Sequence, residues 1–95
     1  MVMTILEAHV ELDMIPALQA AYQNGFTHLP PQMVQTFLVQ SVSDKTLCRI
    51  VSIWKSLEAL DEMRHSMETP EGILMFRAAG AEPKLSIFDI SASAP

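Results

Sequence analysis

Four strongly apolar segments and two regions with helical spacing alternate along the chain. The apolar segments are residues 2–10, 33–39, 46–54 and 84–91. The first three are apolar at both odd and even positions, apart from a few polar residues, and this pattern is typical of β-strands whose two faces are both covered. The fourth alternates more clearly, with Leu85 and Ile87 on either side of Ser86. The pattern therefore predicts four strands.

The first helical region follows the first strand. Between Asp13 and Asn24, apolar residues recur at spacings of three and four positions, which predicts an amphipathic helix. Asp13 has the side chain of a good N-cap, and Gly25 is typical of the position just past a helix end. We therefore expect the helix to begin after Asp13 and to end before Gly25.

The second helical region begins at Ser56, which is also a suitable N-cap. Its apolar stripe consists of Leu57, Leu60, Met63 and Met67. The sequence Thr69-Pro70-Glu71 predicts that the helix breaks and restarts there, with Thr69 as the new N-cap and Pro70 at the first helical position. Gly80 is expected to end the restarted helix.

The order of these elements, β-α-β-β-α-β, predicts a ferredoxin-like α+β fold. The short polar connection Ser43-Asp44-Lys45 predicts a hairpin between the second and third strands. Right-handed crossovers would then place both helical regions on one face of a four-stranded antiparallel sheet. At 95 residues the chain is long enough for one such domain, residues 1–95, but not for two.

The opposite face of this sheet has no predicted cover. It would carry alternate residues of the apolar strands, which makes a larger apolar patch than a monomer in water usually exposes. A second copy of the same sheet, related by a twofold axis, would cover that patch. We therefore expect a homodimer that packs sheet to sheet.

Charge and hydropathy exclude several classes of partner. The chain has Lys+Arg 6 against Asp+Glu 11 and a formal net charge of −5, which argues against nucleic acid because phosphate contacts need clustered basic side chains. Its apolar runs are shorter than the roughly 18–20 residues of a membrane-spanning helix, and residues 1–10 lack the basic start of a secretory signal. No membrane partner is expected, and the cytoplasm is the expected location.

Metal and disulfide chemistry are not indicated by the sequence. Cys48 is the only cysteine, so the chain forms no internal disulfide and no cysteine-based metal cage. The three histidines, His9, His28 and His65, do not have the spacing of metal ligands. We expect no metal site, and we expect Cys48 to be a small buried hydrophobic residue.

The segment from Trp54 to Leu60, W-K-S-L-E-A-L, is similar to the W-x-S-x-E-A-L signature of the antibiotic biosynthesis monooxygenase family. The resemblance extends over residues 2–91. It implies a dimeric α/β barrel in which each subunit binds a ligand between its helices and its sheet. Some members of the family oxidise aromatic polyketide or quinol substrates with molecular oxygen and without a metal or flavin, whereas others degrade haem.

Two departures from the family patterns bear on the reaction. Members often carry a histidine nine residues after the signature Trp, and Met63 occupies that position here. The chain also lacks the Asn in the first strand and the Trp in the second helix that haem-degrading members use, which argues against haem degradation. The resemblance thus implies a monooxygenase that needs no cofactor and acts on a small aromatic substrate of the quinol or anthrone type. The alternatives are a non-catalytic dimeric module that binds a small molecule or only assembles, and a haem-binding protein.

Three residues are candidates for contact with this small apolar or aromatic ligand. Trp54, at the end of a central strand, and Tyr22, at the end of the apolar stripe of the first helix, are expected to wall the cavity. Met63 is expected to face the same space. The alternative for both aromatic residues is a structural role, in the core for Trp54 and at the surface for Tyr22.

Charged residues on the central strands form a second candidate group. Glu7 and His9 share one face of the first strand, and either is a candidate catalytic base toward a phenolic substrate. Arg49, on the neighbouring strand, is expected to pair with Glu7 because an unmatched buried charge is costly. Arg49 is also a candidate substrate-binding residue. The alternative for Glu7 and Arg49 is an ion pair that fixes the register of the dimer.

Overall fold

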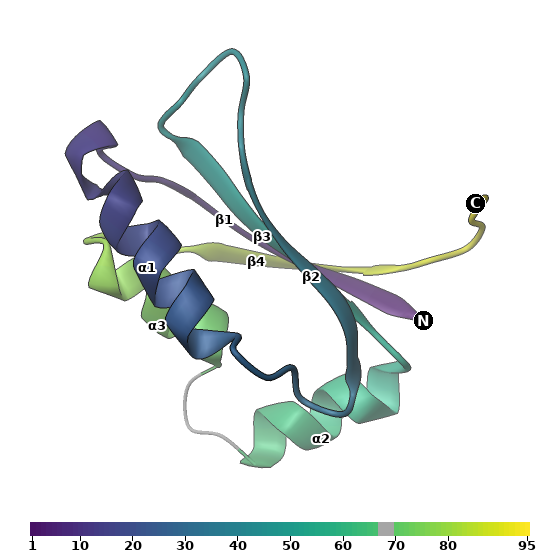
Figure 1. Ribbon diagram of the computed structural model, residues 1–95. Helices are drawn as coiled ribbons and strands as arrows, with labels where there is room; N and C mark the ends of the chain where they lie inside the picture. The colour runs from purple at the N-terminus through teal and green to yellow at the C-terminus, as the bar shows by residue number, and fades with distance from the viewer. Residues whose placement is uncertain (67–69) are drawn as a thin grey trace.

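The computed structural model of the chain describes residues 1–66 and 70–95 (Figure 1). Its elements, in chain order, are β1 (Val2–His9), the short 3-10 helix η1 (Leu12–Met14), α1 (Ile15–Gly25), β2 (Met33–Gln40), β3 (Leu47–Trp54), α2 (Leu57–Ser66), α3 (Glu71–Ala78) and β4 (Lys84–Asp89). The four strands lie where the apolar segments predict them. The second helical region consists of two helices, as its interrupted pattern indicates.

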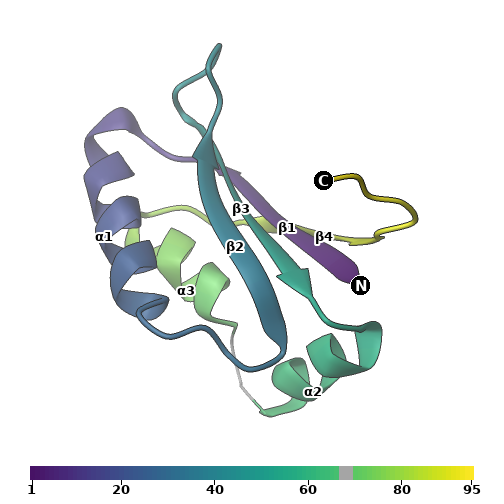
Figure 2. The same ribbon diagram turned by 45° about the vertical axis from the view of Figure 1, so that its right-hand side comes forward.

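The four strands form one antiparallel sheet in the order β2-β3-β1-β4. This order and the βαββαβ sequence of elements make the fold ferredoxin-like α+β, as predicted. Helices α1 and α3 lie side by side over one face of the sheet, and α2 packs at the end where β3 leads into it (Figures 1 and 2). Within the described segments, no helix has the length and apolar character needed to cross a membrane.

The core lies between the helices and the sheet, in two adjoining clusters. The larger cluster is centred on residues that are at most 2% exposed: Val10, Leu18, Cys48, Ile50 and Phe76. The smaller cluster joins α2 to the end of the sheet and contains Val2, Met33, Trp54 and Leu60. Alternation along the strands explains this placement, because every second residue of β1 and β3 faces the helices and is buried.

Two predicted helix caps are present. The backbone N–H of Ala59 donates to the Ser56 hydroxyl at 3.0 Å, so Ser56 caps α2. Gly80 has a φ of 76°, the left-handed conformation that glycine adopts without strain. There the N–H of Gly80 donates to the carbonyl of Arg77 and the N–H of Ala81 to the carbonyl of Phe76, both at 3.0 Å. These two bonds end α3 in a Schellman motif.

Three other predicted caps differ from the structure. Asp13 lies inside η1, and α1 begins after Met14 without a side-chain cap, because η1 leads directly into α1 and its Leu12 carbonyl accepts from the N–H of Ile15. Gly25 is the last residue of α1 and not the residue after it, and Phe26 is the C-cap, whose N–H donates to the Tyr22 carbonyl. Pro70 is the N-cap of α3 and not its first helical residue. Thr69 and Met67 lie outside the described residues.

The sheet face away from the helices, here called the open face, is apolar and is not covered by any of the described residues. Its apolar side chains are Met3, Ile5, Phe37, Val39, Val51, Ile53 and Phe88. Phe88 is 52% exposed and Phe37 is 44% exposed. This surface corresponds to the uncovered face expected from the sequence, and a monomer in water rarely exposes such a contiguous apolar area.

Candidate functional site

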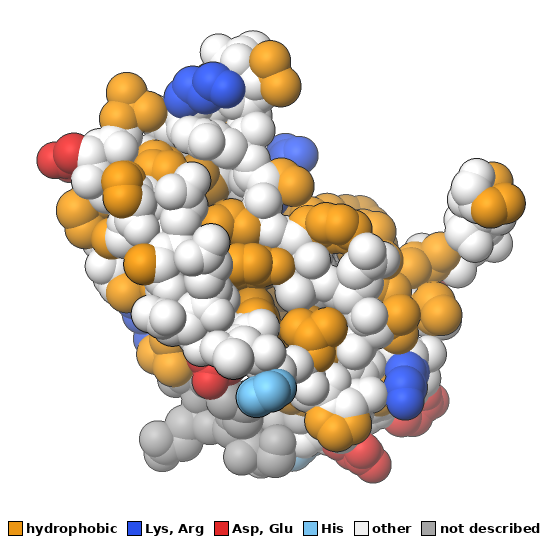
Figure 3. Space-filling model, viewed as in Figure 1, with side chains coloured by type: hydrophobic (Ala, Val, Ile, Leu, Met, Phe, Trp, Pro, Cys, Tyr) orange, Lys and Arg blue, Asp and Glu red, His pale blue; other side chains and the backbone are white. Residues whose placement is uncertain are grey.

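The main hollow on the helix side of the sheet lies between α1 and the strands β2 and β3, and is called the α1 cavity here. Its volume is about 300 Å³. Its lining residues are Ile15, Leu18, Gln19, Tyr22, Gln23, Leu38, Val39, Gln40 and Cys48. Figure 3 shows apolar side chains gathered between α1 and β2 on this side of the molecule. None of these described lining residues is acidic or basic.

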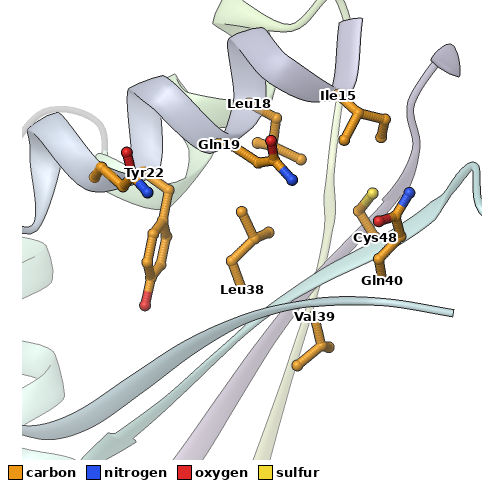
Figure 4. A pocket seen from close by; sticks show the side chains of 9 residues that line it. Ile15, Leu18, Gln19, Tyr22, Leu38, Val39, Gln40 and Cys48 are labelled. Atoms are coloured by element: carbon orange, nitrogen blue, oxygen red, sulfur yellow. The ribbon is translucent and has the colours of Figure 1, made fainter. Parts of the chain in front are cut away.

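Helical spacing explains why α1 presents its lining residues to one space. Ile15, Leu18, Gln19 and Tyr22 are related by three-, four- and seven-residue steps, which place them on one side of a helix. Leu38 and Gln40 alternate with outward residues on β2, so both point from the sheet toward α1. Figure 4 shows the two walls facing each other, with Leu18 and Leu38 between them.

The α1 cavity has an apolar floor and a polar rim. Leu18 and Cys48 are 1% and 2% exposed and form the deep part. Burial raises the pKa of the Cys48 thiol, and the Asp44 carboxylate raises it further, so this side chain is the small buried hydrophobic residue predicted. The amides of Gln19, Gln23 and Gln40 and the Tyr22 hydroxyl supply neutral donors and acceptors at the rim.

Tyr22 and Trp54 line different hollows. A void of about 50 Å³ adjoins Trp54 and is also lined by Met63 and Phe26, and it shares no lining residue with the α1 cavity. Phe26 separates the two spaces, because its ring meets Tyr22 edge-on at a centroid distance of 5.2 Å and also packs against the Trp54 cluster. The structure therefore does not bring Tyr22 and Trp54 into one cavity.

Trp54 has the contacts of a core residue. It is 4% exposed, and its indole N–H donates to the Thr4 hydroxyl at 3.0 Å. Thr4 lies on the adjacent strand β1, so Trp54 has the structural role in the core that the sequence left open as the alternative. Met63 and Phe26 pack against the cluster that contains the ring, and two small voids of about 50 Å³ and 40 Å³ remain beside it. Phe76 is fully buried in the larger core cluster.

Glu7, His9 and Arg49 lie on the open face, on the other side of the sheet from the α1 cavity. Glu7 is opposite Arg49 in the β1–β3 register, and the two form the expected ion pair through Arg49 Nε and Glu7 Oε1. Lys84 on β4 is opposite Glu7 on its other side. The three charges form a row across the open face. The sheet itself separates this row from a ligand in the α1 cavity.

His9 interacts with the β2–β3 hairpin. Its Nδ1 lies 3.0 Å from the Thr46 hydroxyl oxygen and 3.6 Å from Asp44 Oδ2, and its side chain is 67% exposed. Hydrogen bonds from the Thr46 side chain and backbone hold the pKa of Asp44 below its ordinary value, and His9 adds a smaller effect. These contacts place His9 at the root of the hairpin.

The remaining histidines are exposed, as expected for solvated residues. His65 on α2 is within 2.7 Å of the Asp61 carbonyl, one turn back along the helix. His28 lies in the connection between α1 and β2. Among the described residues, no group of three His, Cys, Asp or Glu side chains could hold a metal ion.

The glutamines of the α1 cavity are not among the site residues predicted from the sequence. Gln19 lies four positions after Ile15 and three positions before Tyr22. This helical spacing could have placed it on the same side of α1 as the apolar residues. Gln40 carries no local signal, because its part in the cavity depends on how α1 lies against the edge strand β2.

Comparison with known proteins shows similarity at the level of structure. No protein-family model matches the sequence, and no curated protein matches it either. The cofactor-independent oxygenase SnoaB from Streptomyces nogalater superimposes with a TM-score of 0.73 at 13% identity, over 99% of this chain and 96% of that one. A protein described as an antibiotic biosynthesis monooxygenase gives 0.70 at 16% identity, over 100% of both chains.

MhuD, solved with two manganese protoporphyrin IX molecules bound per active site, gives a TM-score of 0.75 at 17% identity, over 100% of this chain and 99% of that one. At these identities the likeness establishes the fold. The chain therefore has the fold of the antibiotic biosynthesis monooxygenases, the family that its W-x-S-x-E-A-L segment resembles.

Proposed function

We propose that this protein is a cofactor-independent monooxygenase that binds a small, electron-rich aromatic substrate of the quinol or anthrone type in the α1 cavity. The observation that supports this proposal is a cavity of about 300 Å³ with an apolar floor and a neutral polar rim, in a fold that a cofactor-independent oxygenase also has. That volume is at the lower end of the range for ligand pockets, roughly 300–1,000 Å³. It suits a compact molecule.

The proposed reaction needs no external reductant. An anthrone-like substrate loses a proton from its methylene carbon, and the resulting enolate gives electrons to molecular oxygen. A carbon–oxygen bond forms, and the hydroperoxide then loses water. One oxygen atom becomes the new carbonyl and the other leaves as water, while the methylene carbon supplies all the electrons.

The rim of the α1 cavity contains groups that would assist this reaction. Amide N–H groups of Gln19 and Gln23 and the Tyr22 hydroxyl would donate hydrogen bonds to the enolate oxygen as negative charge develops on it. Fixed donors aimed at a developing charge are among the strongest contributions to catalysis. The described lining residues include no carboxylate or imidazole, so the substrate proton would leave through water at the mouth.

The non-catalytic alternative has its own support. The described lining residues of the α1 cavity include no general base, and the voids beside Trp54 measure only about 50 Å³ and 40 Å³. A module that only binds a small aromatic molecule would need no more than the apolar floor and the amide rim. Binding and oxidation therefore have to be measured separately.

We also propose that two copies pair through their open faces. Exposed Phe37 and Phe88 and their apolar neighbours supply the surface. The charged row on this face would influence how two sheets align, because charges that lose water in an interface need partners. The row consists of Arg49, Glu7 and Lys84. The α1 cavity lies on the opposite side of each sheet.

The decisive experiment measures oxygen uptake and ligand binding with a panel of anthrones and quinols. We expect Tyr22→Phe to lower turnover while the protein stays folded. Separate Glu7→Gln and His9→Gln variants are matched controls on the open face, and they should keep full turnover. Binding without oxygen uptake would favour the non-catalytic alternative, and loss of turnover in either control would restore Glu7 or His9 as the base. If no member of the panel binds, both functions are wrong.

A further inference from the structure

The Gln40 side chain is held in one orientation at the rim of the α1 cavity. Its Nε2 donates to the backbone carbonyl of Lys45 at 2.6 Å, in the hairpin that follows β2. This bond identifies which end of the amide is nitrogen, because a carbonyl accepts and does not donate. In Figure 4 the amide nitrogen points away from the cavity floor and the oxygen lies toward Cys48. Gln40 Oε1 is therefore a fixed acceptor for a ligand.

Gln19 stands on the opposite wall, where α1 faces β2 (Figure 4). Its side-chain amide makes no hydrogen bond to another residue in the described part of the chain, so both its donors and its acceptor are available. A ligand between the two walls would meet a fixed acceptor on the strand side and an adaptable amide on the helix side.

The charge of the lining limits what this pair of amides can recognise. A ligand carboxylate or ammonium entering the cavity would lose water without gaining an opposite charge, which is costly. A neutral molecule that carries a hydrogen-bond donor beside a carbonyl would satisfy both amides. Its flat apolar remainder would rest on Leu18, Leu38 and Cys48.

We propose that the α1 cavity selects neutral, flat aromatic molecules that carry an N–H or O–H donor next to a carbonyl. The donor bonds to Gln40 Oε1 and the carbonyl accepts from the Gln19 amide. This selectivity rests on the proposed ligand site in the α1 cavity and does not depend on oxygen chemistry. Gln40 is the specificity-determining residue.

The test is a binding series followed by NMR titration of the intact protein. The probes are the bicyclic lactam isoquinolone, its N-methyl derivative, naphthalene and naphthoate. We expect isoquinolone to bind about threefold to tenfold more tightly than the N-methyl derivative, which is the usual worth of one neutral hydrogen bond. Naphthoate should bind more weakly than either, and the largest shifts should be at Leu18, Tyr22 and Cys48.

A pair of matched variants isolates Gln40. Gln40→Leu should abolish the difference between isoquinolone and its N-methyl derivative. Gln35→Leu makes the same change on the same strand but on the open face, where Gln35 pairs with Ile53 in the register. It should leave the difference intact. The unchanged protein also tests the inference by itself, so the result does not depend on how well Gln40→Leu folds.

The outcomes separate this inference from the proposed ligand site. If isoquinolone and its N-methyl derivative bind the unchanged protein equally, or if naphthoate binds best, the selectivity is wrong and the site survives. The same holds if Gln35→Leu and Gln40→Leu have equal effects. If none of the four probes shifts the cavity residues, the ligand site itself is wrong.

Discussion

The ring of Phe26 meets the ring of Tyr22 edge-on, with centroids 5.2 Å apart and an interplanar angle of 69°. The same ring packs against the cluster that contains Trp54. One side chain therefore divides the helix side of the sheet into the α1 cavity and the smaller void beside Trp54.

Phe26→Ala should join these two spaces. Because Phe26 is only partly buried, we expect a loss of about 2–3 kcal/mol in the free energy of unfolding, at or below the low end for a fully buried Phe. The variant should also accept larger aromatic ligands than the unchanged protein does. Urea unfolding and ligand titration measure the two effects. Leu74→Ala, at a position that is 47% exposed on α3, is the control and should change neither. An unchanged ligand range would mean that Phe26 is not the partition.

Thr4→Val tests the hydrogen bond that Trp54 makes in the core. The valine keeps the shape of the side chain but leaves the indole N–H without its acceptor at a position that is 7% exposed. We expect a loss of about 1–3 kcal/mol, the cost of one unsatisfied buried donor. The measurement is a double-mutant cycle, in which the free energy of unfolding is determined for Thr4→Val, for Trp54→Phe and for the double variant. The cost of Thr4→Val should shrink in the Trp54→Phe background. A strictly additive result would show that the bond contributes nothing.

Val51→Lys tests the proposed pairing through the open face. Val51 lies on the central strand β3, opposite Ile5 and Phe37 in the register, so the change places a charge in the middle of the apolar surface. We expect the dimer dissociation constant to rise at least about a hundredfold, because an unmatched buried charge costs several kcal/mol. Sedimentation equilibrium measures it. Leu57→Lys, on α2 and 47% exposed, should leave the dimer intact. A monomeric unchanged protein would contradict the pairing.

Asp44 should make the folded state sensitive to acid. Hydrogen bonds from Thr46 lower its pKa in the folded protein, so the contribution of Asp44 is fully present above the ordinary aspartate pKa of about 3.9. It is lost as the pH falls through the lower folded-state pKa. Asp44→Asn should therefore flatten the acid side of the stability curve. Urea midpoints measured across this pH range test it, with Asp61→Asn on α2 as the control. If the stability of Asp44→Asn falls at low pH as steeply as that of the unchanged protein, Asp44 is not a source of the acid sensitivity.

The strands and the hairpin were predictable because they depend on local periodicity and turn chemistry. The caps at Ser56 and Gly80 were predictable for the same reason, since each needs only its own neighbours in the chain. Gly25 was misplaced by one position because local patterns fix a helix end only to within one or two residues. The close approach of Met75 on α3 to Gly25 was not predictable either. Contacts between helices carry no signal in a local pattern.

The division of the candidate residues between two faces was partly visible in the sequence. Arg49 and Trp54 are five positions apart on one strand, and an odd separation places two side chains on opposite faces. The parity therefore separates Arg49, and with it Glu7, from any pocket that contains Trp54. The gap between α1 and β2 was not visible, because it depends on the angle at which the helix lies on the sheet.

The position of the α1 cavity has a consequence for saturation behaviour. In a dimer joined through the open faces, each ligand would enter the outer side of its own subunit, and the β-sheet of that subunit would lie between the ligand and the dimer interface. Ligand binding to one subunit would then leave the ligand affinity of the other subunit unchanged. Titration should follow a simple hyperbola with one equivalent per chain, and dilution into monomers should leave the half-saturation concentration unchanged.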